Sequence, residues 1–249
     1  MQQVVPVVML LGLWAAISKV GPWPALLFPS PFAVLKSFIS MAADGRLVAG
    51  ALKSLSRLFQ GYFISVCVGL PLGVLIARMP WLNRGLKPLI SGLQALPSIC
   101  WLPLAILWFG LSESAIIFVV VMGSLLSVTI ATEDGIRGIP PQLLAVSGTL
   151  GIRGLRLYAG VLIPAALPGI ITGLKLGWSF AWRALMAGEL LFVAGGLGQL
   201  LTTGRELLDV PQVMAVMGAI ILIGVATDRL LFQTVEARVR RRWGLVAPT

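Results

Sequence analysis

The chain contains no histidine, two cysteines and few charged side chains. Without histidine it lacks the commonest general base and the commonest metal ligand of proteins. Charged residues make up 11% of the 249 residues, whereas soluble domains average roughly 25%. Cys67 and Cys100 both lie inside apolar runs, where cysteine is most simply an ordinary buried side chain. We therefore expect a membrane protein with no catalytic residue, no metal site and no cofactor bound by the chain itself.

The sequence also lacks a phosphate-binding loop of the form G-x-x-x-x-G-K-[ST]. None of its five lysines lies in such a context. The chain therefore cannot hydrolyse ATP by the usual route. If it transports a solute, the transport is passive, driven by a gradient, or powered by another subunit.

Apolar sequence is abundant, at 58% hydrophobic residues with a mean hydropathy of +0.97. A bilayer core about 30 Å thick needs roughly 20 apolar residues per helix. Six segments qualify or nearly do: 1–18, 58–77, 88–112, 114–131, 161–192 and 210–227. The first lacks the basic leader of a signal peptide, so we expect a retained helix. The sequence predicts an all-α integral membrane protein with about six transmembrane helices.

Basic residues around these segments predict the orientation in the membrane. With the N-terminus inside, eleven Lys and Arg residues fall in cytoplasmic segments and six in outer ones, so both termini are predicted to be cytoplasmic. The exception is Lys19–Arg57, which is rich in proline and is interpreted as a surface loop followed by an amphipathic helix. The net charge of +10 is attributed to these membrane flanks, and no nucleic-acid partner is expected. Three parts follow: a first helix with an outer segment (1–48), a core permease domain (49–232) and a basic tail (233–249), which would anchor in the inner leaflet.

The longest hydrophilic connection is Glu133–Gly160. Pro140 and Pro141 can start a short helix, Gly148 and Gly151 would end it, and a second short turn would follow. The pattern predicts a helix–turn–helix at the inner membrane face.

Part of this connection resembles the "EAA" loop of type I ABC importer permeases. The family pattern is E-A-A, three residues, G, nine residues and I-x-L-P. Gly151 and Pro164 match its two most diagnostic positions at the right separation, whereas Ala145 replaces the glutamate. Segments around Pro97, Trp101–Leu104, Trp108–Gly110 and Trp182–Glu189 resemble the nitrate/sulfonate/taurine branch of the family.

The resemblance implies a type I permease fold in the inner (plasma) membrane and several partners. These would be cytoplasmic ATP-binding subunits that consume the ATP, an extracytoplasmic solute-binding protein and a second copy of the chain. Residues 133–160 would couple the chain to the ATPase. The candidate coupling residues are Gln142, Ala145, Ser147, Gly148, Gly151, Arg153 and Pro164.

Two stripes of polar residues are candidates for the solute path. Lys175, Ser179 and Arg183 recur every four residues in the fifth segment, nearly opposite a ridge of small residues formed by Gly169, Gly173, Gly177 and Ala181. A charge in the bilayer costs at least about 2.5–3.5 kcal/mol. The cations therefore either face a path for small oxyanions or are satisfied structurally, Arg183 by Glu189 or Asp228 and Lys175 by reaching the membrane surface.

Ser91, Gln94 and Ser98 form the second stripe, in the third segment. Pro97 and Pro103 interrupt the helical hydrogen bonds beside it. This stripe either lines the path or bonds a neighbouring helix. Two other functions stay open, a secondary transporter or channel that works alone and a membrane-embedded enzyme. The transported solute is open as well: nitrate, a sulfonate, taurine, bicarbonate or a neutral compound.

Overall fold

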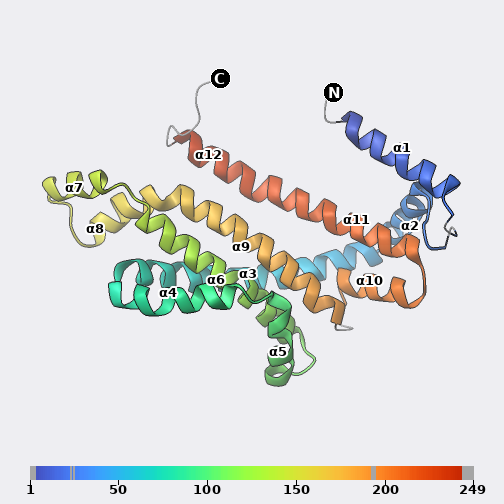
Figure 1. Cartoon of the computed structure of the whole chain (residues 1–249), viewed down its shortest axis with the longest axis horizontal. Coiled ribbons are helices and arrows are strands. Elements are labelled where there is room, and N and C mark those ends of the chain that lie inside the picture. The colour runs from blue at the N-terminus through green and yellow to red at the C-terminus, as the bar shows by residue number, and fades with distance from the viewer. Residues whose placement is uncertain (1–3, 23, 25, 192–194, 243–249) are drawn as a thin grey trace. The chain divides into compact units, whose positions relative to one another are not determined.

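The computed structural model describes residues 4–22, 24, 26–191 and 195–242, and every regular element in these ranges is helical (Figure 1). This confirms the predicted all-α class. The α-helices are α1 (Val4–Val20), α2 (Pro31–Ala43), α3 (Arg46–Arg78), α4 (Pro80–Gln94), α5 (Leu102–Phe109), α6 (Glu113–Arg137), α7 (Pro141–Thr149), α8 (Leu155–Leu157), α9 (Ile163–Leu191), α10 (Leu197–Glu206), α11 (Val210–Thr227) and α12 (Thr234–Arg242). A 3-10 turn, η1 (Ser98–Trp101), and two π-helical turns, η2 (Tyr158–Leu162) and η3 (Asp228–Gln233), complete the set.

Four helical stretches are long and apolar enough to cross a membrane: Arg46–Arg78, Glu113–Arg137, Gly160–Leu191 and Val210–Val239. A fifth candidate is the pair Pro80–Gln94 and Ser98–Phe109, which is bent by 101°. These correspond to five of the six predicted segments. The first predicted segment forms α1, which is 17 residues long. The chain is therefore a multi-pass membrane protein.

Helix α3 begins earlier than the sequence predicted. It starts at Arg46 instead of near Leu58, so the last part of the predicted outer segment is continuous with the spanning helix. Asp44 favours this start, because its carboxylate accepts hydrogen bonds from the backbone N–H and the Nε of Arg46. The hydrogen bond from the Arg46 side chain holds the pKa of the Asp44 carboxyl below its ordinary value.

Arg57 shows why a basic residue can lie inside this helix. Its side chain is 1% exposed, and its guanidinium lies 2.8 Å from the Glu113 carboxylate at the start of α6. Buried charges are tolerated when they are paired. Arg57 is therefore buried and paired, and the expectation that the Lys19–Arg57 segment lies on the surface up to its last residue was wrong.

The third predicted segment is sharply bent instead of straight. Helix α4 ends at Gln94, and α5 turns away from it (Figure 1). Pro97 explains the break, since proline lacks an N–H donor and disfavours the helical conformation of the residue before it. Pro103 lies in the first turn of α5, where no donor is needed.

The described residues divide into two compact units, and the larger contains residues 57–188 and 225–249. Helix α6 is the most buried of the four long stretches, with 56% of its apolar window covered. On one side α3 approaches it through glycines. A Cβ added at Gly61 would lie 2.6 Å from Cγ1 of Val120, and one at Gly73 would lie 2.6 Å from the carbonyl oxygen of Thr129.

Helix α9 approaches α6 through the predicted small-residue ridge. A Cβ at Gly173 would overlap Cβ of Ala131, and one at Gly177 would lie 2.7 Å from Cγ2 of Val128. Such small residues let helix backbones come close enough for extensive van der Waals contact in a membrane. The predicted role of the ridge in close helix packing is confirmed.

The smaller unit contains residues 1–56 and 189–224. At its centre the buried carboxylate of Glu189 accepts hydrogen bonds from Ser54 Oγ at 2.7 Å and from the backbone N–H of Gly198 at 3.0 Å. The second bond places a negative charge at the start of α10, where the helix dipole favours it. Gly196, with φ of +109°, lies beside this carboxylate, and a Cβ there would lie 2.6 Å from Glu189 Oε1. Glu189 thus fixes the start of α10.

The Gly173 contact predicts a steric effect of substitution. Gly173→Val should lower the thermal unfolding midpoint of the detergent-solubilised chain, because overpacking costs about 1–3 kcal/mol. The matched control is Gly218→Ala in α11, where an added Cβ meets nothing within 4 Å. Equal midpoints for the two variants would contradict the close α6–α9 contact.

Candidate functional site

The first candidate region is the connection between α6 and α9. Helix α7 begins at Pro141, as predicted, since proline is well suited to a first helical turn. Helix α6 continues to Arg137, so Glu133 and Asp134 belong to α6 and not to the connection. The prediction that the connection begins at Glu133 was wrong in this respect.

Gly151 ends the α7 segment in a specific way. Its φ is +69°, in the left-handed region that favours glycine. The N–H of Ile152 donates to the carbonyl of Ser147 at 2.9 Å, and the N–H of Gly151 donates to that of Gly148 at 3.1 Å. These two bonds define a Schellman motif. Gly148 itself lies inside the helix, so the prediction that it breaks the helix was wrong.

The return to α9 differs from the predicted second helical turn. Gly154 also has a positive φ, of +60°, and α8 is only three residues long. The π-helical turn η2 then leads directly into α9, whose second residue is Pro164. The outcome is a compact hairpin whose two changes of direction are made by glycines.

One face of α7 is apolar and exposed. Leu143, Val146 and Leu150 are 43%, 56% and 69% exposed, and their spacing places them on one side of a helix. Gln142 and Ala145 are also exposed, whereas Ser147 is buried. Sequence reasoning missed this stripe, although the three-then-four spacing of its apolar residues was visible.

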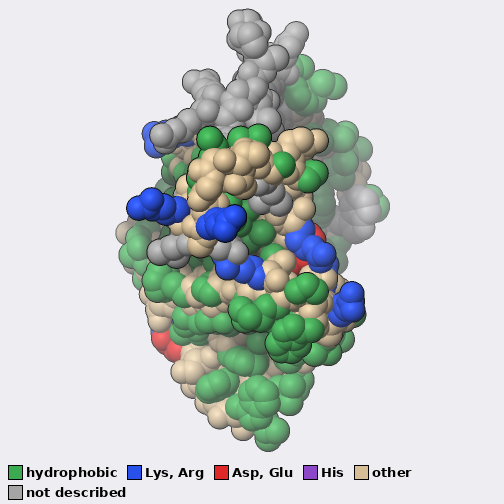
Figure 2. Space-filling view, turned by 90° about the vertical axis from the view of Figure 1, so that its left-hand side faces the viewer, with side chains coloured by type: hydrophobic (Ala, Val, Ile, Leu, Met, Phe, Trp, Pro, Cys, Tyr) green, Lys and Arg blue, Asp and Glu red, His purple; other side chains and the backbone are tan. Residues whose placement is uncertain are grey.

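Positive charge accompanies the apolar stripe. Arg153 and Arg156 follow α7 and are exposed, and the sequence contains no acidic residue from 135 to 188. Figure 2 shows the end of the molecule at which α7 and α8 lie, and Lys and Arg side chains outnumber Asp and Glu on it. An apolar face with basic flanks is suited to bind a protein partner or the membrane surface.

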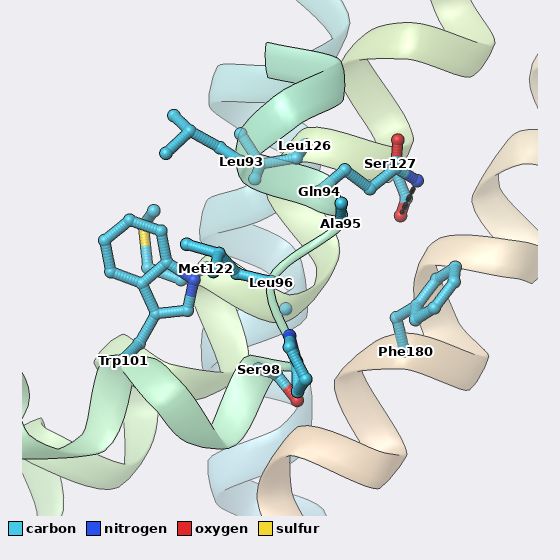
Figure 3. A pocket seen from close by; sticks show the side chains of 12 residues that line it. Leu93, Gln94, Ala95, Leu96, Ser98, Trp101, Met122, Leu126, Ser127 and Phe180 are labelled. Carbon is cyan, nitrogen blue, oxygen red and sulfur yellow. Dashed lines mark hydrogen bonds between the residues drawn. The ribbon is translucent and has the colours of Figure 1, made fainter. Parts of the chain in front are cut away.

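The second candidate region is a pocket of about 230 Å³ at the break between α4 and η1 (Figure 3). Gln94 and Ser98 lie in its wall, with Ser127 of α6 and Phe180 of α9. The Gln94 amide donates to Ser127 Oγ at 3.0 Å. Ser91, the remaining residue of the predicted stripe, is exposed and does not line this pocket. Gln94 therefore does what each of the two alternatives required, since it forms a hydrogen bond with a neighbouring helix and also faces a cavity.

Helix α9 carries the two candidate cations. Lys175 Nζ lies 3.1 Å from Asp228 Oδ1, and Gln233 also donates to this carboxylate. Arg183 is exposed, its Nε donates to the carbonyl of Ser179, and its guanidinium lies 4.6 Å from the centre of the Phe180 ring. The structure thus pairs Lys175 with a carboxylate and places Arg183 beside an aromatic wall of the pocket.

Comparison with known proteins identifies a family whose matched region includes the α7 hairpin and the long helices α6, α9 and α11. Residues 69–241 match the family of binding-protein-dependent transport system inner membrane components. The chain belongs to this family. The match covers Gly151 and Gly154 of the hairpin and both candidate cations of α9.

Individual relatives of this permease carry transport names. An aliphatic sulfonates transport permease protein of Escherichia coli is 33% identical over 219 residues, covering 88% of this chain and 83% of the relative. A riboflavin transport system permease protein of Chloroflexus aurantiacus is 32% identical over 221 residues, covering 88% and 82%. The predicted family, including its sulfonate/taurine branch, is confirmed.

A solved structure shares the fold of the permease. The MetNI methionine ABC transporter, in an inward-facing conformation, aligns with a TM-score of 0.67 at 21% identity, covering 81% of this chain and 97% of that chain. The predicted type I permease fold is thereby confirmed.

The Lys175–Asp228 pair predicts a coupled effect on the stability of the permease. Lys175→Met and Asp228→Asn should each lower the unfolding midpoint. The loss of unfolding free energy in the double variant should be smaller than the sum of the two single losses by about 1 kcal/mol, because contacting residues are usually coupled. A thermal double-mutant cycle in detergent measures this coupling. Additive losses would show that the pair is not a structural unit and would favour a solute-facing Lys175.

Proposed function

We propose that the chain forms the transmembrane path of an ATP-driven importer for small anions and couples to cytoplasmic ATP-binding subunits through the connection after α6, residues 138–160. The observation that carries this proposal is the α7 hairpin. It is short, closed by a Schellman motif at Gly151 and apolar on an exposed face. A chain that worked alone would have no need for such a surface.

The hairpin is suited to receive the motion of an ATP-binding subunit that is bound to it. A short rigid helix can pass the rigid-body motion of one subunit to the elements attached to it. Helix α7 follows α6 after three residues and returns through η2 into α9. Closure of two ATP-binding subunits would draw the hairpins together and switch the path from inward-facing to outward-facing. The chain itself would bind no ATP and would not be an enzyme.

The solute path would pass the pocket at Gln94 and Ser98 and the cation at Arg183. Arg183 is the better anion site of the two cations, because the charge of Lys175 is offset by Asp228. The relative named for sulfonates supports an anionic solute. The relative named for riboflavin is almost as similar, so the choice of an anion rests on Arg183.

The assembly would contain a second copy of the chain, since a symmetric pair of subunits readily encloses a central path. A solute-binding protein would deliver the solute from outside, in keeping with the family description. Both termini would lie in the cytoplasm, with Arg238 of α12 near the inner leaflet. The rest of the predicted anchor, the side chains of residues 240–242 and all of residues 243–249, lies outside the described residues.

Gly151→Val tests the coupling role. A β-branched residue at φ of +69° is strained, and left-handed backbone costs about 1–2 kcal/mol per non-glycine residue. The variant should insert normally, yet in proteoliposomes it should lose most of the ATP hydrolysis that the loaded binding protein stimulates. Gly45→Val is the matched control, since Gly45 has a similar φ of +79° and open space around it but lies outside the hairpin.

Two outcomes would overturn the proposed function. One is normal stimulation of ATP hydrolysis in Gly151→Val. The other is uptake of radiolabelled taurine or nitrate at full rate by the purified chain without an ATP-binding subunit, which would favour a secondary transporter or channel.

Arg183→Gln tests the anion path. Uptake of radiolabelled taurine by the assembled transporter should fall about tenfold or more, because removing the cation forfeits an interaction worth about 1.5–3 kcal/mol. Basal ATP hydrolysis should change less than twofold. Arg229→Gln, another exposed arginine, provides the control, and equal losses of uptake and hydrolysis in Arg183→Gln would indicate a structural role.

A further inference from the structure

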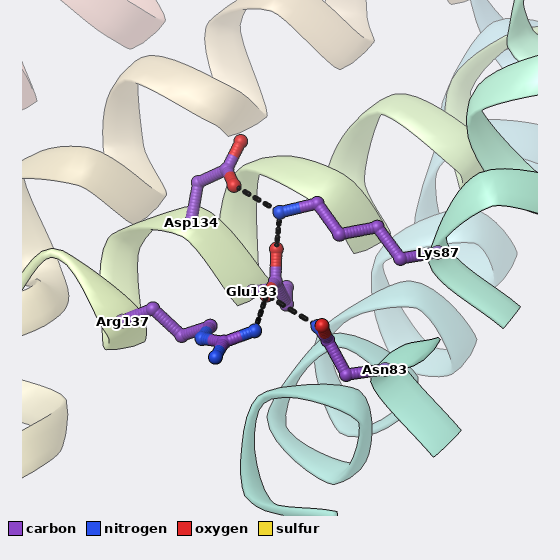
Figure 4. A network of polar contacts seen from close by, with 5 residues as sticks. All are labelled: Asn83, Lys87, Glu133, Asp134 and Arg137. Atoms are coloured by element: carbon purple, nitrogen blue, oxygen red, sulfur yellow. Dashed lines mark hydrogen bonds and ion pairs between the residues drawn. The ribbon is translucent and has the colours of Figure 1, made fainter. Parts of the chain in front are cut away.

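A buried carboxylate joins α4 to the C-terminal end of α6 (Figure 4). Glu133 is 1% exposed and accepts from Asn83 Nδ2 at 2.7 Å, from Lys87 Nζ and from Arg137 at 3.4 Å. Lys87 also donates to Asp134 at 2.8 Å. Lys87 thus bridges two consecutive carboxylates of α6 from a neighbouring helix.

Helix α4 is held to α6 at two further levels. Ile90 packs with Leu126 and Ile76 in an apolar cluster, and Gln94 donates to Ser127. From Asn83 to Gln94 the attachment extends over about 16 Å, at 1.5 Å per residue. Apolar packing alone leaves the lengthwise register of two helices weakly fixed, whereas charge-assisted hydrogen bonds are directional. The Glu133 network therefore sets the position of α4 along α6.

The two ends of this attachment lie at functionally distinct places. At one end, α7 begins only three residues after Arg137. Ile139 in this connection is buried against Ala166 and Ile170 of α9, so the base of α7 is anchored as well. At the other end, Leu93 and Gln94 form part of the pocket wall.

We infer that Lys87 and Glu133 are positioning residues that make α4 move with α6, so that displacement of α7 reaches the pocket at Gln94 and Ser98. This inference rests on the proposed function. Without the network, only the Ile90 packing and the Gln94–Ser127 hydrogen bond would link the two helices, so α4 would follow α6 less completely and the pocket wall would respond less to the ATP-binding subunits.

The test measures movement of the pocket in the assembled transporter and requires no knowledge of the solute. With Cys67 and Cys100 replaced by serine, spin labels at Ser91→Cys on α4 and Ser179→Cys on α9 report a distance across the pocket region. The distance distribution is compared between nucleotide-free and ATP-trapped complexes. Lys87→Met should reduce the nucleotide-dependent shift by at least half, while basal ATP hydrolysis stays within twofold of the parent protein.

Matched variants distinguish a loss of the movement passed from α6 to α4 from a general destabilisation of the transporter. Arg84→Met removes a cation from the same helix, but Arg84 makes no hydrogen bond or ion pair with any described residue, so the shift should be retained. Lys87→Arg keeps the charge and should restore the shift. If Lys87→Met does not assemble, the isosteric Glu133→Gln takes its place and should also reduce the shift.

Each result decides between defined alternatives. A full shift in Lys87→Met or in Glu133→Gln overturns the inference and leaves the proposed function intact. A loss of the shift in Arg84→Met as large as that in Lys87→Met overturns it too. A parent transporter that shows no nucleotide-dependent shift would count against the proposed function and the inference together.

Discussion

Close backbone contact on both sides of α6 is the constraint on which the larger unit depends. Within a membrane, lipid is as apolar as leucine, so helices associate through van der Waals contact and hydrogen bonds instead of the hydrophobic effect. Glycines of α3 and α9 bring these helices against α6, and Ser65 and Ser124 add a hydrogen bond of 2.7 Å between α3 and α6. With α6 fixed in this way, its two ends position the ion pair of Arg57 and the base of the α7 hairpin.

Local sequence pattern predicted the features that depend on neighbouring residues. The apolar segments are helical, Pro141 starts α7, Gly151 ends the α7 segment, and the glycine ridge of α9 makes close contact. Each follows from hydropathy, from proline or from glycine. The same reasoning located an interruption of the helical hydrogen bonds at Pro97, although it did not predict the bend of 101° there.

Features that depend on partners distant in sequence were not predictable in this way. Arg57 was expected in a surface-lying segment, because its partner Glu113 is 56 residues away and could not be identified from the sequence. Glu133 is the first residue of a hydrophilic pair, which led to its assignment to the connection. It is buried because Asn83 and Lys87 reach it from α4. For Lys175 the sequence offered a solute path or the membrane surface and gave Asp228 to Arg183, whereas three-dimensional packing brings Asp228 to Lys175. A charge in an apolar segment signals that a partner is needed without identifying it.

The contact between Ala131 and Gly173 also defines how α9 can tilt. The methyl group of Ala131 occupies the space that a side chain at position 173 would fill, so the two helices cannot separate or slide there without losing the fit. Gly173 lies ten residues from the start of α9 and ten from Arg183, or about 15 Å in each direction. A tilt of α9 about this contact would therefore displace the start of the helix and the position of Arg183 by equal amounts in opposite directions.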